Sequence, residues 1–273
     1  MTDDSVPAET LPDATPAEQA AAFLLEMRLE RRVEIDLPDG LVPADFTSAY
    51  AIQDRVVSRL LDDGDESSGY KCACTSEIAQ QALAIDRPVF GRLMPHTTSA
   101  SGVTLPADGF THRVIEAEIG FVMGSDVPAR DGGHDRESIA EHISAALPSI
   151  EIVDYRYNDW TVGALQVAAD NAIHGWWIEG TEVADWRDLD LADVAVEVRR
   201  NGEIATTGSG ANVLGHPLEV MAWLANELPM YGRALRTGDR ITTGVTTDVF
   251  EAEAGDSISA SFAGLGDVSV DFV

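Results

Sequence analysis

The sequence has little positive charge for its length. Its 273 residues include 47 aspartate and glutamate residues but only 18 lysine and arginine residues, so the formal net charge is −29 at pH 7. Such a chain repels the phosphate backbone of a nucleic acid and the anionic surface of a membrane. We therefore expect neither nucleic acid nor membrane among its partners.

Long apolar runs are also absent, and none approaches the roughly 18 residues of a membrane-spanning helix. The start of the chain, MTDDSVPAET, is acidic and lacks the basic and then apolar layout of a secretory signal peptide. These features predict a cytoplasmic protein. The acidic excess is typical of proteins that work in concentrated salt, where screening weakens the repulsion among like charges, so we also expect a halophilic protein.

Cysteine and glycine patterns exclude several further classes of protein. The two cysteines, Cys72 and Cys74, cannot form a disulfide framework, and a Cys-x-Cys motif without a second ligand pair does not make a structural zinc site. The chain has no Walker loop, no dinucleotide-binding glycine loop and no internal repeat. We expect both cysteines to pack in the interior.

The chain has a single lysine, Lys71, and every other basic residue is an arginine. A buried ammonium group can lose its proton, whereas a guanidinium group cannot. Lys71 is therefore a candidate for a chemical role that arginine cannot fill. The alternative is a surface lysine retained by chance.

By composition the chain divides into three parts. Residues 1–14 are small, acidic and proline-containing, which predicts a disordered lead. Residues 15–85 form a mostly helical N-terminal part, in which the first helix begins at Thr15, followed by a proline and a capping-box glutamate. Residues 86–273 form the larger, strand-rich unit.

Hydrophobic periodicity and turn residues locate the remaining elements. Predicted helices cover residues 45–62, 76–84, 136–147 and 217–228. Predicted strands cover residues 114–123, 149–155, 194–200, 203–207, 240–244, 247–252, 257–262 and 267–272.

Two glutamates share one face of the predicted strand 114–123. Alternate residues of a strand project to the same side, so Glu116 and Glu118 lie about 7 Å apart along the strand, opposite an entirely apolar face. Two carboxylates so close repel each other unless a cation, a proton or solvent separates them. On their own, they are explained as a solvated acidic surface.

A third glutamate, Glu151, lies in the predicted strand 149–155 between two isoleucines. Three carboxylates on neighbouring strands, with positions left open for water and substrate, suit a hard divalent cation such as Mg²⁺ or Mn²⁺. Such a cation can chelate the carboxylate and 2-oxygen of a 2-oxo acid and stabilise the enolate formed as protons move along the carbon chain. The sequence thus predicts a divalent-metal site for a small 2-oxo acid.

Several blocks of sequence carry a family resemblance through their order and spacing. The blocks are Gly69-Tyr70-Lys71, Asp86-Arg87-Pro88-Val89-Phe90-Gly91, Ile115-Glu116-Ala117-Glu118-Ile119, Leu147-Pro148-Ser149-Ile150-Glu151-Ile152-Val153, Ala169-Asp170-Asn171-Ala172, Leu214-Gly215-His216-Pro217-Leu218 and Thr243-Gly244. From about residue 50 to its end, the chain resembles the 2-keto-4-pentenoate hydratase branch of the fumarylacetoacetate hydrolase superfamily.

The resemblance implies an α+β fold, with a mixed β-roll core that follows a helical N-terminal part, assembled as a homo-oligomer. It also implies one divalent metal per subunit, with Glu116, Glu118 and Glu151 matching the family's metal ligands. Lys71 matches the family's active-site lysine, which binds the substrate carboxylate or helps to move a proton. Residues 86–273 would then be the metal-binding catalytic domain.

The chain departs from this branch after Asp-Asn-Ala at residues 170–172. Members usually continue with a serine that helps to hold the substrate, whereas this chain continues with Ile173 and His174. Asp170 remains a candidate substrate-binding residue, and His174 is a candidate to replace the lost hydroxyl, the alternative being a packed or interface histidine. Thr243 is a further substrate-binding candidate, or it simply ends a strand.

The activity implied by the resemblance is that of a metal-dependent hydro-lyase in aromatic catabolism. It would add water to a 2-hydroxy-2,4-dienoate to give a 4-hydroxy-2-oxo acid. Alternatives on the same scaffold are a 4-oxalocrotonate decarboxylase, favoured if a second cation such as Arg87 or Arg92 faces the pocket, and an acylpyruvate hydrolase. A catalytically silent homologue that binds a 2-oxo acid is an alternative of a different class.

Overall fold

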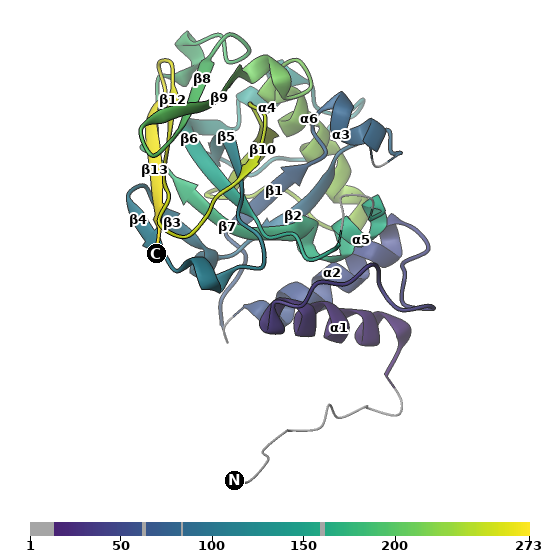
Figure 1. Ribbon diagram of the computed structural model, residues 1–273. Helices are drawn as coiled ribbons and strands as arrows, with labels where there is room; N and C mark the ends of the chain where they lie inside the picture. The colour runs from purple at the N-terminus through teal and green to yellow at the C-terminus, as the bar shows by residue number, and fades with distance from the viewer. Residues whose placement is uncertain (1–13, 62–63, 83, 159–161) are drawn as a thin grey trace.

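The computed structural model describes residues 14–61, 64–82, 84–158 and 162–273, whose strands form two sheets (Figure 1). The predicted lead of residues 1–14 lies, apart from Ala14, outside these residues. The larger sheet contains β1 (Gly69–Ala73), β2 (Val89–Leu93), β3 (Thr98–Ala100), β5 (Val114–Met123), β6 (Ile143–Val153), β7 (His174–Glu179), β10 (Arg240–Val245) and β11 (Phe250–Glu251). The smaller sheet contains β4 (Val103–Leu105), β8 (Ala195–Arg200), β9 (Glu203–Ser209), β12 (Ser257–Phe262) and β13 (Gly266–Phe272).

Both sheets are mixed. The larger runs in the order β2-β1-β10-β5-β6-β7-β3, with β11 beside β5, and the smaller in the order β4-β13-β12-β8-β9. The pairs β1 with β10, β3 with β7 and β4 with β13 are parallel, whereas the other pairs are antiparallel. Because β1 lies between β2 and β10, the segment 15–85 contributes a strand to the large sheet as well as helices.

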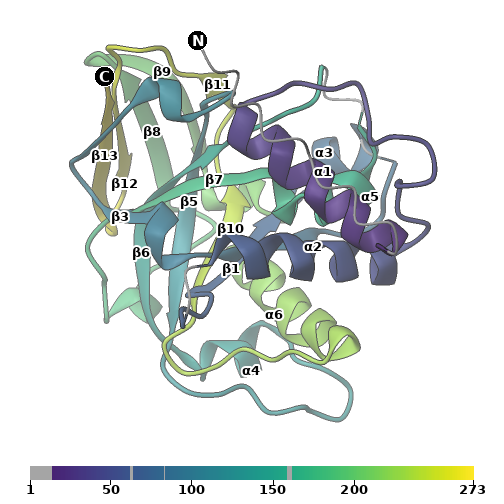
Figure 2. The same cartoon turned by 90° about the horizontal axis from the view of Figure 1, so that it is seen from below.

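The helices are α1 (Pro16–Glu30), α2 (Phe46–Leu60), α3 (Glu77–Ala82), α4 (Arg136–Ala140), α5 (Ala164–Ala169) and α6 (Pro217–Glu227). Thr15 caps α1 and Asp45 caps α2, each through a capping box that satisfies free backbone donors. Figures 1 and 2 show α1 and α2 together at one end of the molecule and the smaller sheet at the opposite end, with the larger sheet between them. No helix among the described residues combines the length and the apolarity needed to cross a membrane.

The long antiparallel pair β5 and β6 forms the middle of the large sheet. Its register places Glu116 directly opposite Glu151 and Glu118 opposite Ser149. The apolar face predicted for β5 is buried, as Ile115, Ala117, Ile119, Phe121 and Met123 all lie in the core. The same pairing brings the three glutamates to neighbouring positions.

Several predicted boundaries were wrong because tertiary pairing overrode local preference. The helix predicted over 136–147 ends at Ala140, and the apolar residues that follow begin β6, which pairs with β5 along its whole length. The strand predicted over 247–252 shortens to β11. Four short strands, β2, β3, β4 and β7, and the helix α5 were not predicted.

Candidate metal centre

Three glutamates converge where β5 and β6 face each other. Each of Glu116, Glu118 and Glu151 offers a carboxylate oxygen, and these atoms all lie within 4.8 Å of one another. Glu118 and Glu151 are fully buried, whereas Glu116 is partly exposed. A solvated acidic surface, the simpler explanation of the sequence pattern, therefore does not describe this cluster.

Glu118 is the strongest indication that a cation belongs here. Neither of its buried carboxylate oxygens accepts a well-formed hydrogen bond from the described part of the chain. Burial, followed by the charges of Glu151 and Glu116, raises its pKa well above the ordinary value, although the charge of Lys71 and then the Gly244 N–H lower it. An all-carboxylate set of oxygens with one unpartnered buried member fits a hard divalent cation.

Lys71 lies on β1 with its side chain 1% exposed, and its Nζ is 3.1 Å from Glu151 Oε2. Burial alone would lower the pKa of this amine, but the charges of Glu151, Glu116 and Glu118 outweigh burial and raise it. In the metal-free protein Lys71 is thus held as a charged ammonium. In this form it can attract a carboxylate or donate a proton.

Glu151 has a partner at each carboxylate oxygen. Lys71 donates to Oε2, and His174 Nδ1 lies 2.8 Å from Oε1. Burial raises the pKa of Glu151, but the charge of Lys71 and the hydrogen bond from His174 outweigh it, so the net pKa is lowered. Burial lowers the pKa of His174, which keeps the imidazole neutral.

Two of the predicted substrate-binding residues have side chains that are already engaged. Asp170 Oδ1 is 3.1 Å from Arg28 Nη2, and Asp170 Oδ2 is 2.6 Å from Arg156 Nη2. Thr243 is buried, and its hydroxyl donates to the Ile119 carbonyl at 2.8 Å. Contact between either side chain and a substrate would require breaking a buried interaction.

Sequence reasoning missed the buried ions around Asp170. Arg156 also pairs with Asp154 at 2.9 Å, and the Nη1 of Arg28 donates to the His174 carbonyl at 2.7 Å. Arg28 lies 146 positions before His174. No local sequence pattern marks a pair so far apart. The general rule that a buried arginine needs a partner applies only once the structure shows which arginines are buried.

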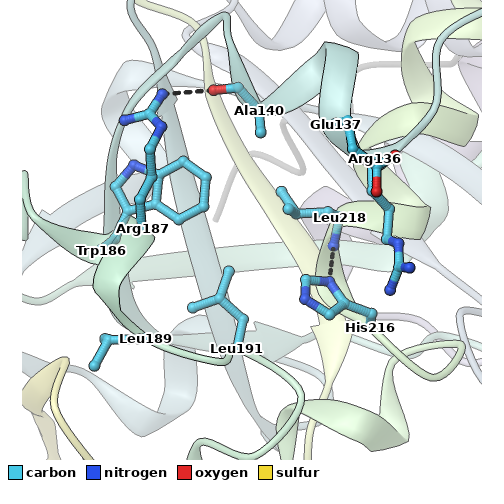
Figure 3. Close-up of a pocket in the computed structure, with 9 residues that line it drawn as sticks. All are labelled: Arg136, Glu137, Ala140, Trp186, Arg187, Leu189, Leu191, His216 and Leu218. Atoms are coloured by element: carbon cyan, nitrogen blue, oxygen red, sulfur yellow. Dashed lines mark hydrogen bonds between the residues drawn. The ribbon is translucent and has the colours of Figure 1, made fainter.

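A surface cavity of about 280 Å³ lies elsewhere, beside α4, the start of α6 and residues 186–191 (Figure 3). Its two arginines have other partners, because Arg187 donates to the Ala140 carbonyl and Arg136 pairs with Glu219. His216 Nδ1 accepts from the Leu218 N–H. The cavity walls contain none of the clustered carboxylates, so we place the chemistry at the glutamates.

The carboxylate cluster gives the metal-free protein a characteristic pH dependence. Burial raises the pKa of Glu116 to about 7 and that of Glu118 well above its usual range, so the folded chain holds protons that the unfolded chain releases above about pH 4.5. In EDTA and high salt, we expect the free energy of unfolding to fall by roughly 1–2 kcal/mol as pH rises from about 5 to 7.5. Urea unfolding at several pH values measures this slope.

Saturating Mg²⁺ should flatten that slope, because a cation replaces the protons. Glu118→Gln should flatten it in EDTA. The lowered pKa of Glu151 acts outside this window, since its contribution is lost only as pH falls below about 4.5. A slope in wild type that neither Mg²⁺ nor Glu118→Gln alters would assign the pH dependence to the general surface charge.

Comparison with known proteins identifies the family. Residues 73–273, more than half of the chain, match the model named fumarylacetoacetate (FAA) hydrolase C-terminal, and the chain belongs to this family. Among its curated relatives, 2-keto-4-pentenoate hydratase 1 of Dechloromonas aromatica (strain RCB) is 34% identical over 258 residues, covering 93% of this chain and 96% of that protein. The 4-oxalocrotonate decarboxylase of Pseudomonas putida is 33% identical over 228 residues, covering 84% of this chain and 86% of that protein.

A solved structure extends the likeness to the fold. The 4-oxalocrotonate decarboxylase from Pseudomonas putida G7, complexed with magnesium and adipate, superposes with a TM-score of 0.88 at 28% identity, covering 94% of this chain and 97% of that one. The resemblance drawn from the sequence blocks is therefore confirmed. Because a hydratase and a decarboxylase are similar to this chain to nearly the same degree, the choice of reaction depends on the site.

Proposed function

We propose that this protein is a metal-dependent hydratase that adds water to a 2-hydroxy-2,4-dienoate in aromatic catabolism, giving a 4-hydroxy-2-oxo acid. The observation that carries the proposal is the buried carboxylate of Glu118, whose oxygens lack well-formed hydrogen bonds within the described residues, beside Glu116 and Glu151. We propose these three residues as ligands of Mg²⁺ or Mn²⁺. The hydratase relative at 34% identity supports the reaction.

Each side chain of the centre would have a distinct task. A divalent cation, when bound, supplies Lewis-acid polarisation of the substrate 2-oxygen. Lys71, which keeps its proton, would pair with the substrate carboxylate or deliver a proton to the dienol carbon chain. The burial of Lys71 and Glu151 keeps bulk water away from this pair and strengthens the attraction.

The arginines that would favour a decarboxylase have other partners. Arg92 pairs in register with Tyr70, so its side chain lies on the face of the sheet opposite Lys71, where the guanidinium sits over the Tyr70 ring and donates to Ser67. Arg87 pairs with Asp86. Among the described residues, the cation that contacts the cluster is Lys71, and one cation suits a substrate with one carboxylate.

The alternative is a 4-oxalocrotonate decarboxylase, favoured by the likeness to the solved enzyme of that name. Turnover of 2-hydroxypenta-2,4-dienoate and of a 2-hydroxydienoate with a second carboxylate, followed by ultraviolet absorbance in high salt, separates the two. We expect Mg²⁺-dependent loss of the monocarboxylate dienol, abolished by EDTA. Decarboxylation of the dicarboxylate alone would establish the alternative, and metal binding without turnover of either would point to an acylpyruvate hydrolase, which hydrolysis of an acylpyruvate tests, or to a silent homologue.

We further propose a cytoplasmic, halophilic homo-oligomer with a β-roll core, in which residues 86–273 form the catalytic domain and 15–85 a helical N-terminal part. The free thiols of Cys72 and Cys74 support a reducing compartment, and the net charge of −29 supports work in concentrated salt. Exposed apolar side chains support self-association. They include Leu29, Ile35, Ile78 and Met230.

A further inference from the structure

A strained turn lies immediately before β7. Three consecutive residues, Asn171, Ala172 and Ile173, have φ values of 51°, 50° and 53°, in the left-handed region that L side chains rarely adopt. For Ile173, which is β-branched, this conformation is especially unfavourable. Such a turn persists only where its surroundings hold it, and strain of this kind tends to cluster at functional sites.

Buried ion pairs hold the turn at its start, and a hydrogen bond to the backbone holds it at its end. Asp170, at its start, is clamped between Arg156 at 2.6 Å and Arg28 at 3.1 Å. The guanidinium of Arg28, which comes from α1, also reaches across the turn and donates to the carbonyl of His174 at 2.7 Å. One arginine from the N-terminal helix therefore ties the residue before the turn to the residue after it.

The first residue of the turn is held by β2. The Asn171 side chain accepts from the Arg92 N–H at 2.7 Å and donates to the Arg92 carbonyl at 3.0 Å. Gly91 permits this approach, because a Cβ at that position would lie 2.5 Å from the Asn171 carbonyl oxygen. The turn is thus anchored on the strand that lies next to Lys71.

His174 directly follows the turn, and its imidazole is fully buried. Its Nδ1 lies 2.8 Å from Glu151 Oε1 and its Nε2 lies 3.2 Å from the Thr97 hydroxyl. Because an ionised carboxylate only accepts, Nδ1 carries the proton toward Glu151, which leaves Nε2 as the acceptor that faces Thr97. The Thr97 hydroxyl has one proton and also lies 3.4 Å from the Met94 carbonyl, so it can donate to either group. Both ring nitrogens thus contact groups of the chain itself.

We propose that His174 is a positioning residue for the metal centre, which holds the carboxylate of Glu151 in its coordinating orientation, and that Arg28 acts through the turn to place His174. The inference rests on the proposed metal site. It gives α1, which lies outside the residues matched by the family model, a defined part in that site. It also replaces the expectation that His174 contacts the substrate.

The test compares Mn²⁺ affinities, measured by titration calorimetry on the full chain in high salt, among matched variants. We expect His174→Ala to bind Mn²⁺ roughly 10–100-fold more weakly than wild type, as for other groups that orient metal ligands. His174→Asn, which keeps a donor near the Nδ1 position, should recover most of the loss. Arg28→Met should weaken binding in the same direction. Arg32→Met, which removes partly exposed ion pairs and a cation–π contact with Phe23, should not.

Thermal melts in EDTA establish that each variant is folded. If Arg28→Met does not fold, Arg28→Lys carries the comparison, because it keeps the charge opposite Asp170 but lacks the fork that also reaches His174. Wild-type affinity in His174→Ala, together with a raised KM for the dienol, would overturn the inference and restore a substrate role. Failure of wild type itself to bind Mn²⁺ would instead overturn the proposed metal site.

Discussion

Replacing Glu118 by glutamine is expected to abolish metal binding and, with it, turnover of the dienol acid. Glu118 is buried, its two oxygens lack well-formed hydrogen bonds within the described chain, and it lies within 4.8 Å of two other carboxylates. An amide is isosteric but supplies no negative charge to a hard cation. We expect turnover to fall by at least about 10³-fold, on the scale of several kcal/mol of lost transition-state stabilisation.

The same substitution should stabilise the metal-free protein. Folding buries the Glu118 carboxyl group and raises its pKa, which costs free energy at neutral pH that an amide does not incur. In EDTA at pH 7.5, we expect the free energy of unfolding to rise by roughly 1–3 kcal/mol. Loss of function together with gain of apo stability is the signature of a ligand site.

Mg²⁺-dependent turnover and urea unfolding in EDTA are the two measurements that check this prediction. Glu203→Gln, at an exposed position of β9, is the matched control and should change neither. Retention of metal-dependent turnover by Glu118→Gln would remove Glu118 from the ligand set. Loss of both stability and activity would show only that the residue is needed for folding.

Replacing Lys71 by methionine is expected to reduce turnover by roughly 10²–10⁴-fold, the range associated with a positioned proton donor. Methionine preserves most of the buried volume but removes the ammonium that lies 3.1 Å from Glu151. Lys71→Arg should not restore activity, because a larger, forked guanidinium does not fit the space of a side chain that is 1% exposed. Steady-state kinetics with the monocarboxylate dienol measure both effects.

The matched control for Lys71 is Arg92→Met on the adjacent strand β2, whose side chain lies on the opposite face of the sheet. We expect this variant to keep nearly wild-type kcat. Metal binding by Lys71→Met should persist, because the three glutamates remain. A drop in kcat in Arg92→Met equal to that in Lys71→Met would show that the two cations act on the substrate together and would favour the dicarboxylate reaction.

Much of the site could be predicted from local patterns. The period of two along residues 114–123 placed Glu116 and Glu118 on one face, and the apolar neighbours of Glu151 indicated a strand with an interior acid. The rarity of lysine drew attention to Lys71, and the structure places its Nζ beside Glu151. These features can be predicted because each depends on residues that are close together in the sequence.

Other features depended on distant parts of the chain. The strand β10 has a register shift between Thr242 and Val245, where it pairs with β5 beside Glu118. The hydroxyls of Thr243 and Thr246 donate to the β5 carbonyls of Ile119 and Ala117, on either side of Glu118. Arg28 reaches His174 across 146 positions. The helix predicted over 136–147 was wrong beyond Ala140 because pairing with β5 outweighed the helical preference of an alanine-rich run.

By itself, the sequence determined the acidic character of the protein, its family, the alternation that brings the glutamates to one face and the helix caps at Thr15 and Asp45. Only the tertiary structure decided that the Glu118 oxygens lack well-formed hydrogen bonds within the described residues, that Lys71 keeps its proton in the metal-free protein, and that Arg87 and Arg92, the cations that would favour a decarboxylase, have other partners. The physical reason is that propensity and periodicity act between near neighbours. Burial and charge pairing depend instead on which distant strands the fold brings together.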